Sequence, residues 1–304
     1  MDNPKVSVII PNYNHARYLD QRIQSVLNQT YQDFEVIILD DCSTDNSLEV
    51  IDKYKDNPKI SQIIVNEKNS GSTFKQWDKG FNIARGNIIW IAESDDYCET
   101  DMLERLVECW KIYPQCSVIQ AASRYVDEFG NIISDCENCM EGIVYEKGYD
   151  AIKRHMVCSN YYIPNASAVT FKKSVALSIP DDYKDYKSSG DRLFWIHMLE
   201  KGGLCTIGIP MSMYRQHNEN RVSSRMEVCG IQCKENYYIN RYLHKKGFIK
   251  GRLRLEEYDF YWKYIHRFPF ENEKIRQELI NLWFPCIILY KALNKLREWR
   301  KRIH

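Results

Sequence analysis

Three acidic residues lie within four positions of one another, directly after an apolar segment. The segment 88–92, IIWIA, is followed by Glu93, Ser94, Asp95 and Asp96. Neighbouring carboxylates repel one another, and this repulsion is tolerated most easily when a divalent cation lies between them. The spacing therefore predicts a site for a divalent cation, with Asp95 and Asp96 as its ligands.

Polar residues also follow the first two apolar segments of the chain. The run PNYN (11–14) follows residues 6–10, and the run DDCST (40–44) follows residues 35–39. In open α/β sheets ligands bind beyond the carboxyl ends of the strands, so both runs and the acidic group are expected to belong to one site.

The sequence has no glycine-rich phosphate loop. Neither G-x-x-x-x-G-K nor G-x-G-x-x-G occurs, which disfavours the usual kinase and dehydrogenase routes. If a nucleotide diphosphate binds, its charge must be met by a metal ion and by scattered basic residues.

The elements that must position these residues alternate between strands and helices. Short apolar segments predict strands, and segments with apolar residues three and four positions apart predict crossover helices. The predicted strands are 6–10, 35–39, 61–65, 88–92 and 117–120, and the predicted helices are 18–28, 45–55, 73–84 and 101–113. This alternation indicates an α/β fold with a mostly parallel sheet flanked by helices.

The alternation stops after residue 121. Residues 125–133, with Gly130-Asn131, predict a hairpin that makes the sheet mixed. A strand is expected at 168–171 and a helix at 191–201, whereas the sequence from about residue 226 onward is helical and aromatic.

Composition limits the class of protein. The 304 residues are 44% hydrophobic and carry a formal net charge of +1, which is typical of a globular protein. Residues 241–304 hold 16 Lys and Arg against 7 Asp and Glu, so this basic tail is +9 and the rest of the chain is −8. Eleven scattered cysteines without a preceding signal-like segment favour a reduced, cytoplasmic location.

Several linked segments resemble one enzyme family. SVIIPNYN, QTYQDFEVIILDDCSTDNS and KGFNIARGNIIWIAESDD are similar to the inverting family 2 glycosyltransferases with the GT-A fold, of the bacterial polysaccharide type. A weaker continuation, SSGDRLFWIHMLEKGG and YRQHNENRVS, extends the resemblance to about residue 224. It implies a catalytic domain over 1–225, with a nucleotide-sugar part (1–125) and an acceptor part (126–225), followed by a helical region over 226–304.

The resemblance implies a nucleotide-sugar donor, with uridine diphosphate as its nucleotide. Pro11 and Tyr13 would line the base, and Asp41 would accept a hydrogen bond from the imide NH of uracil. The residues expected to complete the donor site are Asn14, Ser43, Glu93, Asp95 and Arg215.

The resemblance also implies a metal site and a catalytic base. Asp95 and Asp96 occupy the D-x-D-like position that binds Mg²⁺ or Mn²⁺ in the family, and His217 matches a late segment that can approach the metal. Asp191 matches the general base, which would take the proton from an acceptor hydroxyl as its oxygen attacks the anomeric carbon. A single displacement inverts that carbon.

Structural roles remain open for several of these residues. Asp40 follows a predicted strand, where aspartate often stabilises a turn, and Asp191 begins a predicted helix, where aspartate often caps the helix. Asp181, Asp182 and Asp185 are rival bases, and His217 could be a surface histidine. The chain also departs from the family pattern, with Glu93 in place of Asp and Gln76-Trp77 in place of a basic residue.

The basic tail and the function leave further alternatives. Residues 282–302 combine apolar side chains with lysines and arginines, which is typical of a helix on an anionic membrane surface or of a helix packed on the protein with a solvated basic face. The membrane interpretation predicts a peripheral protein on the inner face of the cell membrane. This protein would act on a glycan or lipid-linked acceptor, without a nucleic-acid partner. The alternative functions are a sugar nucleotidyltransferase and a non-catalytic module that binds a nucleotide or a membrane.

Overall fold

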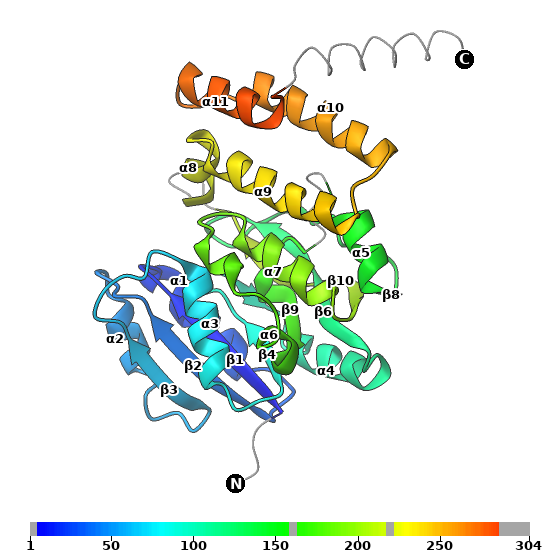
Figure 1. The fold of residues 1–304 in the computed structure, drawn as a ribbon. Helices are drawn as coiled ribbons and strands as arrows, with labels where there is room; N and C mark the ends of the chain where they lie inside the picture. Colours follow the sequence, from blue (N-terminus) through cyan, green and yellow to red (C-terminus); the bar gives the residue numbers. More distant parts are fainter. Residues whose placement is uncertain (1–4, 158–162, 217–221, 286–304) are drawn as a thin grey trace. The chain divides into compact units, whose positions relative to one another are not determined.

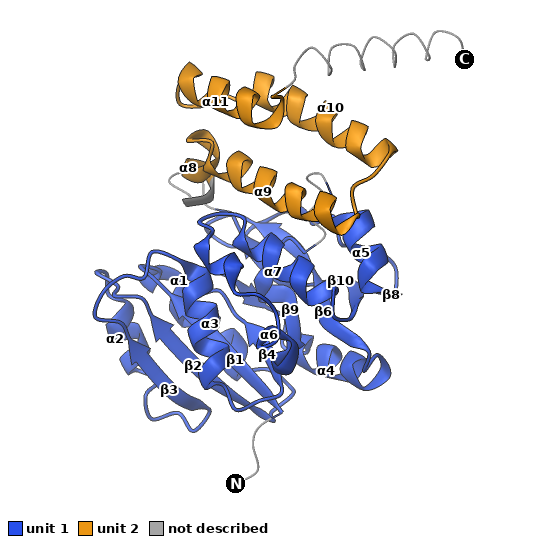
Figure 2. Ribbon diagram, viewed as in Figure 1, with its two compact units in different colours: residues 1–220 blue, residues 221–304 orange. Residues whose placement is uncertain are grey.

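The computed structural model describes residues 5–157, 163–216 and 222–285 (Figure 1). The chain divides into two units, residues 1–220 and residues 221–304 (Figure 2), and each unit is described by itself.

A single mixed sheet forms the centre of the first unit. Its strands lie in the order β3-β2-β1-β4-β9-β6-β10-β5, while β7 pairs with β6 and β8 pairs with β10. The strands are β1 Val6–Asn12, β2 Phe34–Asp40, β3 Ile60–Val65, β4 Ile88–Ile91, β5 Tyr97–Cys98, β6 Cys116–Val126, β7 Ile132–Asp135, β8 Ile143–Glu146, β9 Val169–Lys172 and β10 Gly203–Arg215.

Strand directions bring six strand ends to one edge of this sheet. The strands β3, β2, β1 and β4 are parallel. β9 is antiparallel to both β4 and β6, so β6 and its parallel partner β10 run in the same direction as β1. We call the edge where these six strands end the carboxyl edge, and the opposite edge the amino edge.

Helices cover both faces of the sheet. α1 Ala16–Leu27, α2 Ser47–Asp52 and α4 Met102–Ile112 share a buried apolar cluster with Val6, Val8 and Ile10, the residues of β1 that point to one face. Ile9 points to the other face and packs against Gly80 of α3 Thr73–Ile83. The remaining helical segments are α5 Gly148–His155, η1 Ala166–Ala168, α6 Lys173–Ala176, η2 Asp182–Asp185 and α7 Gly190–Leu199.

One long strand is missing from the sequence prediction. β10 is interrupted by Gly208 and Pro210, residues that weaken a strand pattern. The irregular pairing of β10 with β6 falls between Ile207 and Ser212, so the sheet accommodates both residues at a bulge. The predicted hairpin is present, with β7 antiparallel to β6 and Gly130 at a φ of 93°.

The second unit is helical, as predicted. It contains α8 Val222–Val228, α9 Ile231–Lys246, α10 Arg252–Arg267 and α11 Glu273–Trp283. Its core is aromatic, and the rings of Tyr261 and Trp283 stack with their centroids 3.6 Å apart. Within residues 5–157, 163–216 and 222–285, no helix is long and apolar enough to cross a bilayer. Most of the predicted interfacial segment 282–302 lies outside the described residues.

A buried glutamate ties three segments together at the start of the parallel strands. Glu35 of β2 lies directly opposite Ser7 of β1 and is 3% exposed. Its carboxylate accepts hydrogen bonds from Ser7 Oγ at 2.6 Å, from Arg85 N at 2.7 Å and from Arg85 Nε at 2.7 Å. Burial by itself raises the pKa of Glu35, but these hydrogen bonds outweigh burial and hold the pKa below its ordinary value.

We expect Glu35→Gln to lower the free energy of unfolding at about pH 7 by about 1–3 kcal/mol, because it weakens charge-assisted hydrogen bonds to a buried group. A lowered native pKa stabilises the fold above the unfolded-state pKa, so the difference from wild type should shrink as pH falls through the native pKa. Urea unfolding at about pH 7 and about pH 4 measures both effects. Glu49→Gln, at an exposed glutamate of α2, is the control and should change neither value. Equal effects of the two substitutions would contradict this account.

Candidate active site at the carboxyl edge

The turns after β1 and β2 are bonded to each other. Asp40 accepts hydrogen bonds from Asn12 Nδ2 at 2.7 Å, from Ser43 N at 2.8 Å and from Ser43 Oγ at 2.6 Å. Asp40 is completely buried, so the structure gives it the turn-stabilising role that the sequence left open. Ser43 Oγ also accepts from Asn14 N at 3.0 Å.

Two residues in these turns have left-handed backbones. Asn14 has a φ of 57° and Cys42 a φ of 65°, a conformation that is unfavourable for residues other than glycine. The side-chain amide oxygen of Asn14 stabilises this conformation of Asn14 by accepting a hydrogen bond from Thr44 N at 2.7 Å. Ser43 and Asn14, both predicted donor-site residues, therefore hold the two turns together at the predicted place.

Asp41 organises the loop that leads into α3. Its carboxylate accepts from Asn66 Nδ2 at 2.6 Å, from Ser70 Oγ at 2.8 Å and from Gln76 Nε2 at 2.9 Å. Asp41 is 5% exposed, whereas Tyr13 in the turn after β1 is 45% exposed and Pro11 is buried. The predicted contact of Asp41 with uracil stays a prediction, and the structure adds that this carboxylate already fixes a loop.

Two arginines from distant elements hold the backbone of the acidic segment 93–96. Arg22 of α1 is completely buried, and its Nε donates to the carbonyl of Glu93 at 2.8 Å. Arg215, at the end of β10, donates from Nε to the carbonyl of Asp95 at 2.7 Å. The acidic segment is therefore bonded on both sides to parts of the chain far away in sequence.

The carboxylate of Asp96 points into the protein. It is 2% exposed and accepts from Ser167 Oγ at 2.6 Å and from Arg215 N at 2.8 Å, while Arg22 NH2 lies 4.0 Å away. Burial, followed by the neighbouring charge of Asp95, raises the pKa of Asp96 to about 6. Asp96 thus anchors the segment from beneath, and its predicted role as a metal ligand stays a prediction.

Glu93 and Asp95 are the partly exposed carboxylates of this segment. Glu93 Oε1 accepts from the indole Nε1 of Trp77 at 2.7 Å. Burial, and next the negative charge of Asp95, raise the pKa of Glu93 to about 8. A carboxyl group with such a raised pKa at the edge where strands end is typical of a functional site.

The donor chemistry of this segment fits Mg²⁺ or Mn²⁺. Both ions prefer oxygen ligands, and Mg²⁺ is commonly bound by one or two carboxylates together with substrate phosphates. Asp95 and Glu93 offer such oxygens, although no group of three or more His, Cys, Asp or Glu side chains that could hold a metal occurs in the part of the chain with described coordinates. His217, the third predicted ligand, lies outside the described residues.

The predicted base Asp191 lies in the first turn of α7. This helix leads into β10, which runs toward the carboxyl edge, so α7 begins at that edge. Gly190 packs closely against Phe74 in the first turn of α3, and a Cβ atom on Gly190 would lie 2.5 Å from the Phe74 ring. The structure therefore brings the start of α7 to the carboxyl edge beside the start of α3.

Two of the three rival bases near Asp191 have structural partners. Asp181 forms an ion pair with Lys184 at 2.9 Å, and Asp182 accepts a hydrogen bond from the buried His197 at 2.9 Å. Asp185 is exposed in η2. Asp191 is partly exposed, and its carboxylate accepts a 2.7 Å hydrogen bond from the backbone NH of Arg192. The N-cap residue of α7 is Ser189, so Asp191 is not the helix cap.

Arg215 joins several segments of the chain through hydrogen bonds. Its guanidinium also donates to the carbonyls of Asp127 and Glu128 and to Gln21 Oε1, and it lies 4.5 Å from the ring centroid of Tyr18. The side chain is 3% exposed. Its predicted contact with the diphosphate is untested, and the structure shows that most of its donors are already used.

Sequence reasoning missed three residues of this site: Arg22, Ser167 and Trp77. Arg22 lies in an amphipathic helix, where an arginine is expected to face solvent, and Ser167 comes from a short helical turn without a motif. Trp77 packs in the core against Phe194 and Trp195. The departure from the family pattern at Gln76-Trp77 was the available signal, because both side chains hydrogen-bond site carboxylates.

The structure is that of an α/β protein with a group of acidic side chains at the ends of its parallel strands. The sequence profile of the family described as "Glycosyl transferase family 2" matches residues 7–176, and the chain belongs to this family.

Individual relatives agree with this assignment. An uncharacterized glycosyltransferase of Nostoc sp. is 27% identical over 80% of this chain and 77% of its own length. The chondroitin synthase of Escherichia coli is 30% identical over 81% of this chain, which corresponds to 34% of that larger protein.

A solved structure is similar over nearly the whole chain. Residues 1–349 of Staphylococcus aureus TarS, crystallised with UDP-GlcNAc, superpose with a TM-score of 0.63 and 18% identity, covering 97% of this chain and 92% of that one. At this identity the likeness concerns the fold alone. It confirms the predicted GT-A-like fold, a mixed α/β sheet flanked by helices with a helical carboxyl-terminal region.

We expect Glu93→Gln to stabilise the protein at about pH 8 by about 2 kcal/mol and to have little effect at about pH 5. Because the native pKa is raised, wild-type stability is lost as pH rises from the ordinary carboxyl pKa to the native value, whereas glutamine has no charge to desolvate. The introduced amide keeps an oxygen for the indole of Trp77. Urea unfolding with EDTA at both pH values is the measurement, and a loss of stability at pH 8 would contradict the buried-carboxylate interpretation.

Proposed function

We propose that this protein is an inverting, metal-dependent glycosyltransferase that moves a sugar from a UDP-sugar to an acceptor hydroxyl in surface polysaccharide biosynthesis. The observation that carries the proposal is the convergence of three features at the carboxyl edge: the bonded turns after β1 and β2, the fixed acidic segment 93–96, and the start of α7 with Asp191.

The nucleotide belongs at the turns after β1 and β2. Tyr13 is exposed in the first turn and offers an aromatic face on which a base can stack, and Asp41 lies in the second turn. Support for a UDP-sugar comes from TarS, whose structure was solved with UDP-GlcNAc. Support for polysaccharide synthesis comes from the name of the chondroitin synthase relative.

The diphosphate and metal belong at Glu93 and Asp95. Asp95 is partly exposed, whereas both oxygens of Asp96 accept hydrogen bonds within the protein, so we assign the metal contact to Asp95 with Asp96 holding the segment beneath it. A bound Mg²⁺ or Mn²⁺ would neutralise the charge that develops on the departing diphosphate. His217 remains part of the proposal as a further ligand.

Asp191 is the proposed general base. It accepts the proton of the acceptor hydroxyl while the acceptor oxygen bonds to the anomeric carbon and the bond to the diphosphate oxygen breaks on the opposite face. We assign the role to Asp191 because it lies in the first turn of α7, which begins at the carboxyl edge beside the start of α3.

The basic tail supplies the proposed location. Residues 282–302 would place the enzyme on the anionic inner face of the cell membrane, close to a lipid-linked acceptor. Two other functions predict different chemistry. A sugar nucleotidyltransferase would release pyrophosphate from a nucleoside triphosphate, and a non-catalytic module would bind nucleotide without turnover.

We expect Mn²⁺ to strengthen UDP binding to the wild type and Asp95→Asn to remove that enhancement, a loss of about tenfold or more in affinity. Asp96→Asn should instead lower the melting temperature, because its carboxylate accepts two buried hydrogen bonds. Isothermal titration with UDP, with and without Mn²⁺, and thermal melting measure the two effects. Asp52→Asn, at an exposed aspartate of α2, is the control. If the enhancement of UDP affinity by Mn²⁺ is lost only in Asp96→Asn, and this variant folds normally, then Asp96 and not Asp95 contacts the metal.

We expect Asp191→Asn to lower kcat by about 10²–10⁴ with unchanged UDP affinity, because general-base catalysis contributes about this factor. The assay is UDP release from UDP-glucose, UDP-N-acetylglucosamine and UDP-glucuronic acid. Asp181→Asn, a rival base in an exposed ion pair, is the matched control and should retain wild-type turnover. Equal rates for wild type and Asp191→Asn, or no turnover by the wild type of any nucleotide sugar, would favour the non-catalytic alternative.

A further inference from the structure

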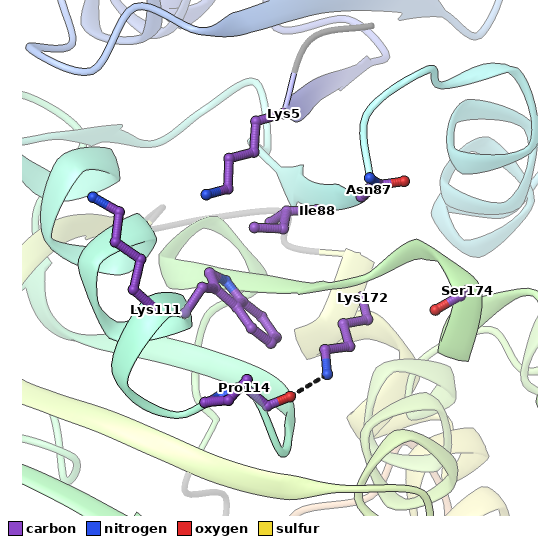
Figure 3. A pocket seen from close by; sticks show the side chains of 8 residues that line it. Lys5, Asn87, Ile88, Lys111, Pro114, Lys172 and Ser174 are labelled. Atoms are coloured by element: carbon purple, nitrogen blue, oxygen red, sulfur yellow. Dashed lines mark hydrogen bonds between the residues drawn. The ribbon is translucent and has the colours of Figure 1, made fainter.

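A pocket opens at the amino edge of the sheet, where β1 and β4 begin (Figure 3). It has a volume of about 410 Å³ and is lined by Lys5, just before β1, and by Asn87 and Ile88 at the start of β4. The seven residues of β1 separate this edge from the turn at Asn12 by roughly 20 Å. The pocket therefore lies apart from the proposed donor site.

Three lysines line this pocket. Lys172 donates a hydrogen bond to the carbonyl of Pro114 (Figure 3), and its Nζ lies 5.7 Å from the ring centroid of Trp110. For the ammonium groups of Lys5 and Lys111 the structure gives neither a hydrogen bond nor an ion pair with any residue in its described segments. None of the described residues that line the pocket is acidic.

The end of a helix accounts for only part of this charge. The pocket lies at the carboxyl end of α4, which carries roughly half a unit of negative charge and favours lysines nearby. Three lysines exceed this requirement, and the described lining offers them no carboxylate. An anionic ligand would act as their counter-ion.

The remaining lining identifies the chemistry of that counter-ion. Asn87 and Ser174 add an amide and a hydroxyl donor, while the carbonyl of Pro114 is already used by Lys172. The lining is thus rich in donors and poor in acceptors, which suits an oxyanion. Its volume exceeds that of a bare phosphate and falls in the range of small-molecule pockets.

The position of Trp110 adds an apolar wall. Its indole Nε1 donates to Thr170 Oγ1 at 3.0 Å, which fixes the ring beside Lys172. Trp110 is 6% exposed, so only the part of the ring that lines the pocket adds an apolar contact beside the Lys172 ammonium group.

We propose that this pocket binds an acidic sugar, a saccharide unit carrying a phosphate or a carboxylate, through Lys5, Lys111 and Lys172. The pocket holds this unit at the edge of the sheet opposite to the site of transfer. The proposal rests on the geometry of the amino edge and holds whatever donor the carboxyl edge uses.

The test is ligand-observed NMR on the full chain with glucose 6-phosphate, glucuronate and glucose as probes. We expect the two acidic sugars to bind, glucose not to bind, and saturating UDP to leave the binding unchanged. The relative affinity of the acidic probes tells whether phosphate or carboxylate is preferred. Lys5→Ala/Lys111→Ala should weaken binding about tenfold or more, because it removes two charged donors. Lys53→Ala, at an exposed lysine that follows α2, is the matched control.

Several results would overturn the proposal. Equal binding of glucose, or binding of inorganic phosphate as tight as that of glucose 6-phosphate, would remove the acidic sugar as ligand. Displacement of glucose 6-phosphate by UDP would place it at the carboxyl edge. An unaltered melting temperature would show that the double variant is folded. Unchanged affinity for the acidic sugars in that folded variant would show that Lys5 and Lys111 do not bind the ligand.

Discussion

The carboxylate of Asp96 is buried, and a buried carboxylate must be hydrogen-bonded or neutralised to be tolerated. Ser167 and the backbone of Arg215 meet this requirement, with Arg22 close behind. These partners come from η1, β10 and α1, so satisfying one side chain fixes the relative positions of three elements. The segment that carries Glu93 and Asp95 is held as a consequence, and both side chains are presented at the edge where six strands end.

The same segment shows why the site is costly to build. Burial and mutual repulsion raise the pKa of Glu93 to about 8 and that of Asp96 to about 6. Glu35, at the opposite end of the strands, has its pKa lowered because its hydrogen bonds outweigh its burial. At the amino edge hydrogen bonds outweigh the burial of Glu35, whereas at the carboxyl edge burial and neighbouring negative charge outweigh the hydrogen bonds of Glu93 and Asp96. This is the arrangement expected of a site that receives positive charge from a ligand.

Much of this fold follows from the sequence, because buried parallel strands leave short apolar segments and crossover helices leave a regular apolar spacing. The predicted α/β class, the hairpin at 125–133 and the helical carboxyl-terminal region are all present. β10 escaped prediction because Gly208 and Pro210 interrupt its pattern at a bulge. Of the site, the strand-end residues could be predicted from position alone. Arg22 and Ser167 could not, since their roles depend on contacts between residues 70 or more positions apart. Asp191, Asp95 and Asp96 remain predicted site residues, and all three lie at the carboxyl edge, whereas His217 lies outside the described residues.

We expect the hydrogen bond from Ser167 Oγ to the Asp96 carboxylate to hold the acidic segment 93–96 in the arrangement that binds the ligand. The most direct measurement is the affinity of Ser167→Ala for UDP in the presence of Mn²⁺, compared with Ser117→Ala, which removes an equally buried hydroxyl that has no hydrogen-bond partner in the described structure. The account predicts a loss of about tenfold for Ser167→Ala, corresponding to about 1.4 kcal/mol, and no change for Ser117→Ala. Wild-type affinity in a folded Ser167→Ala protein would contradict it.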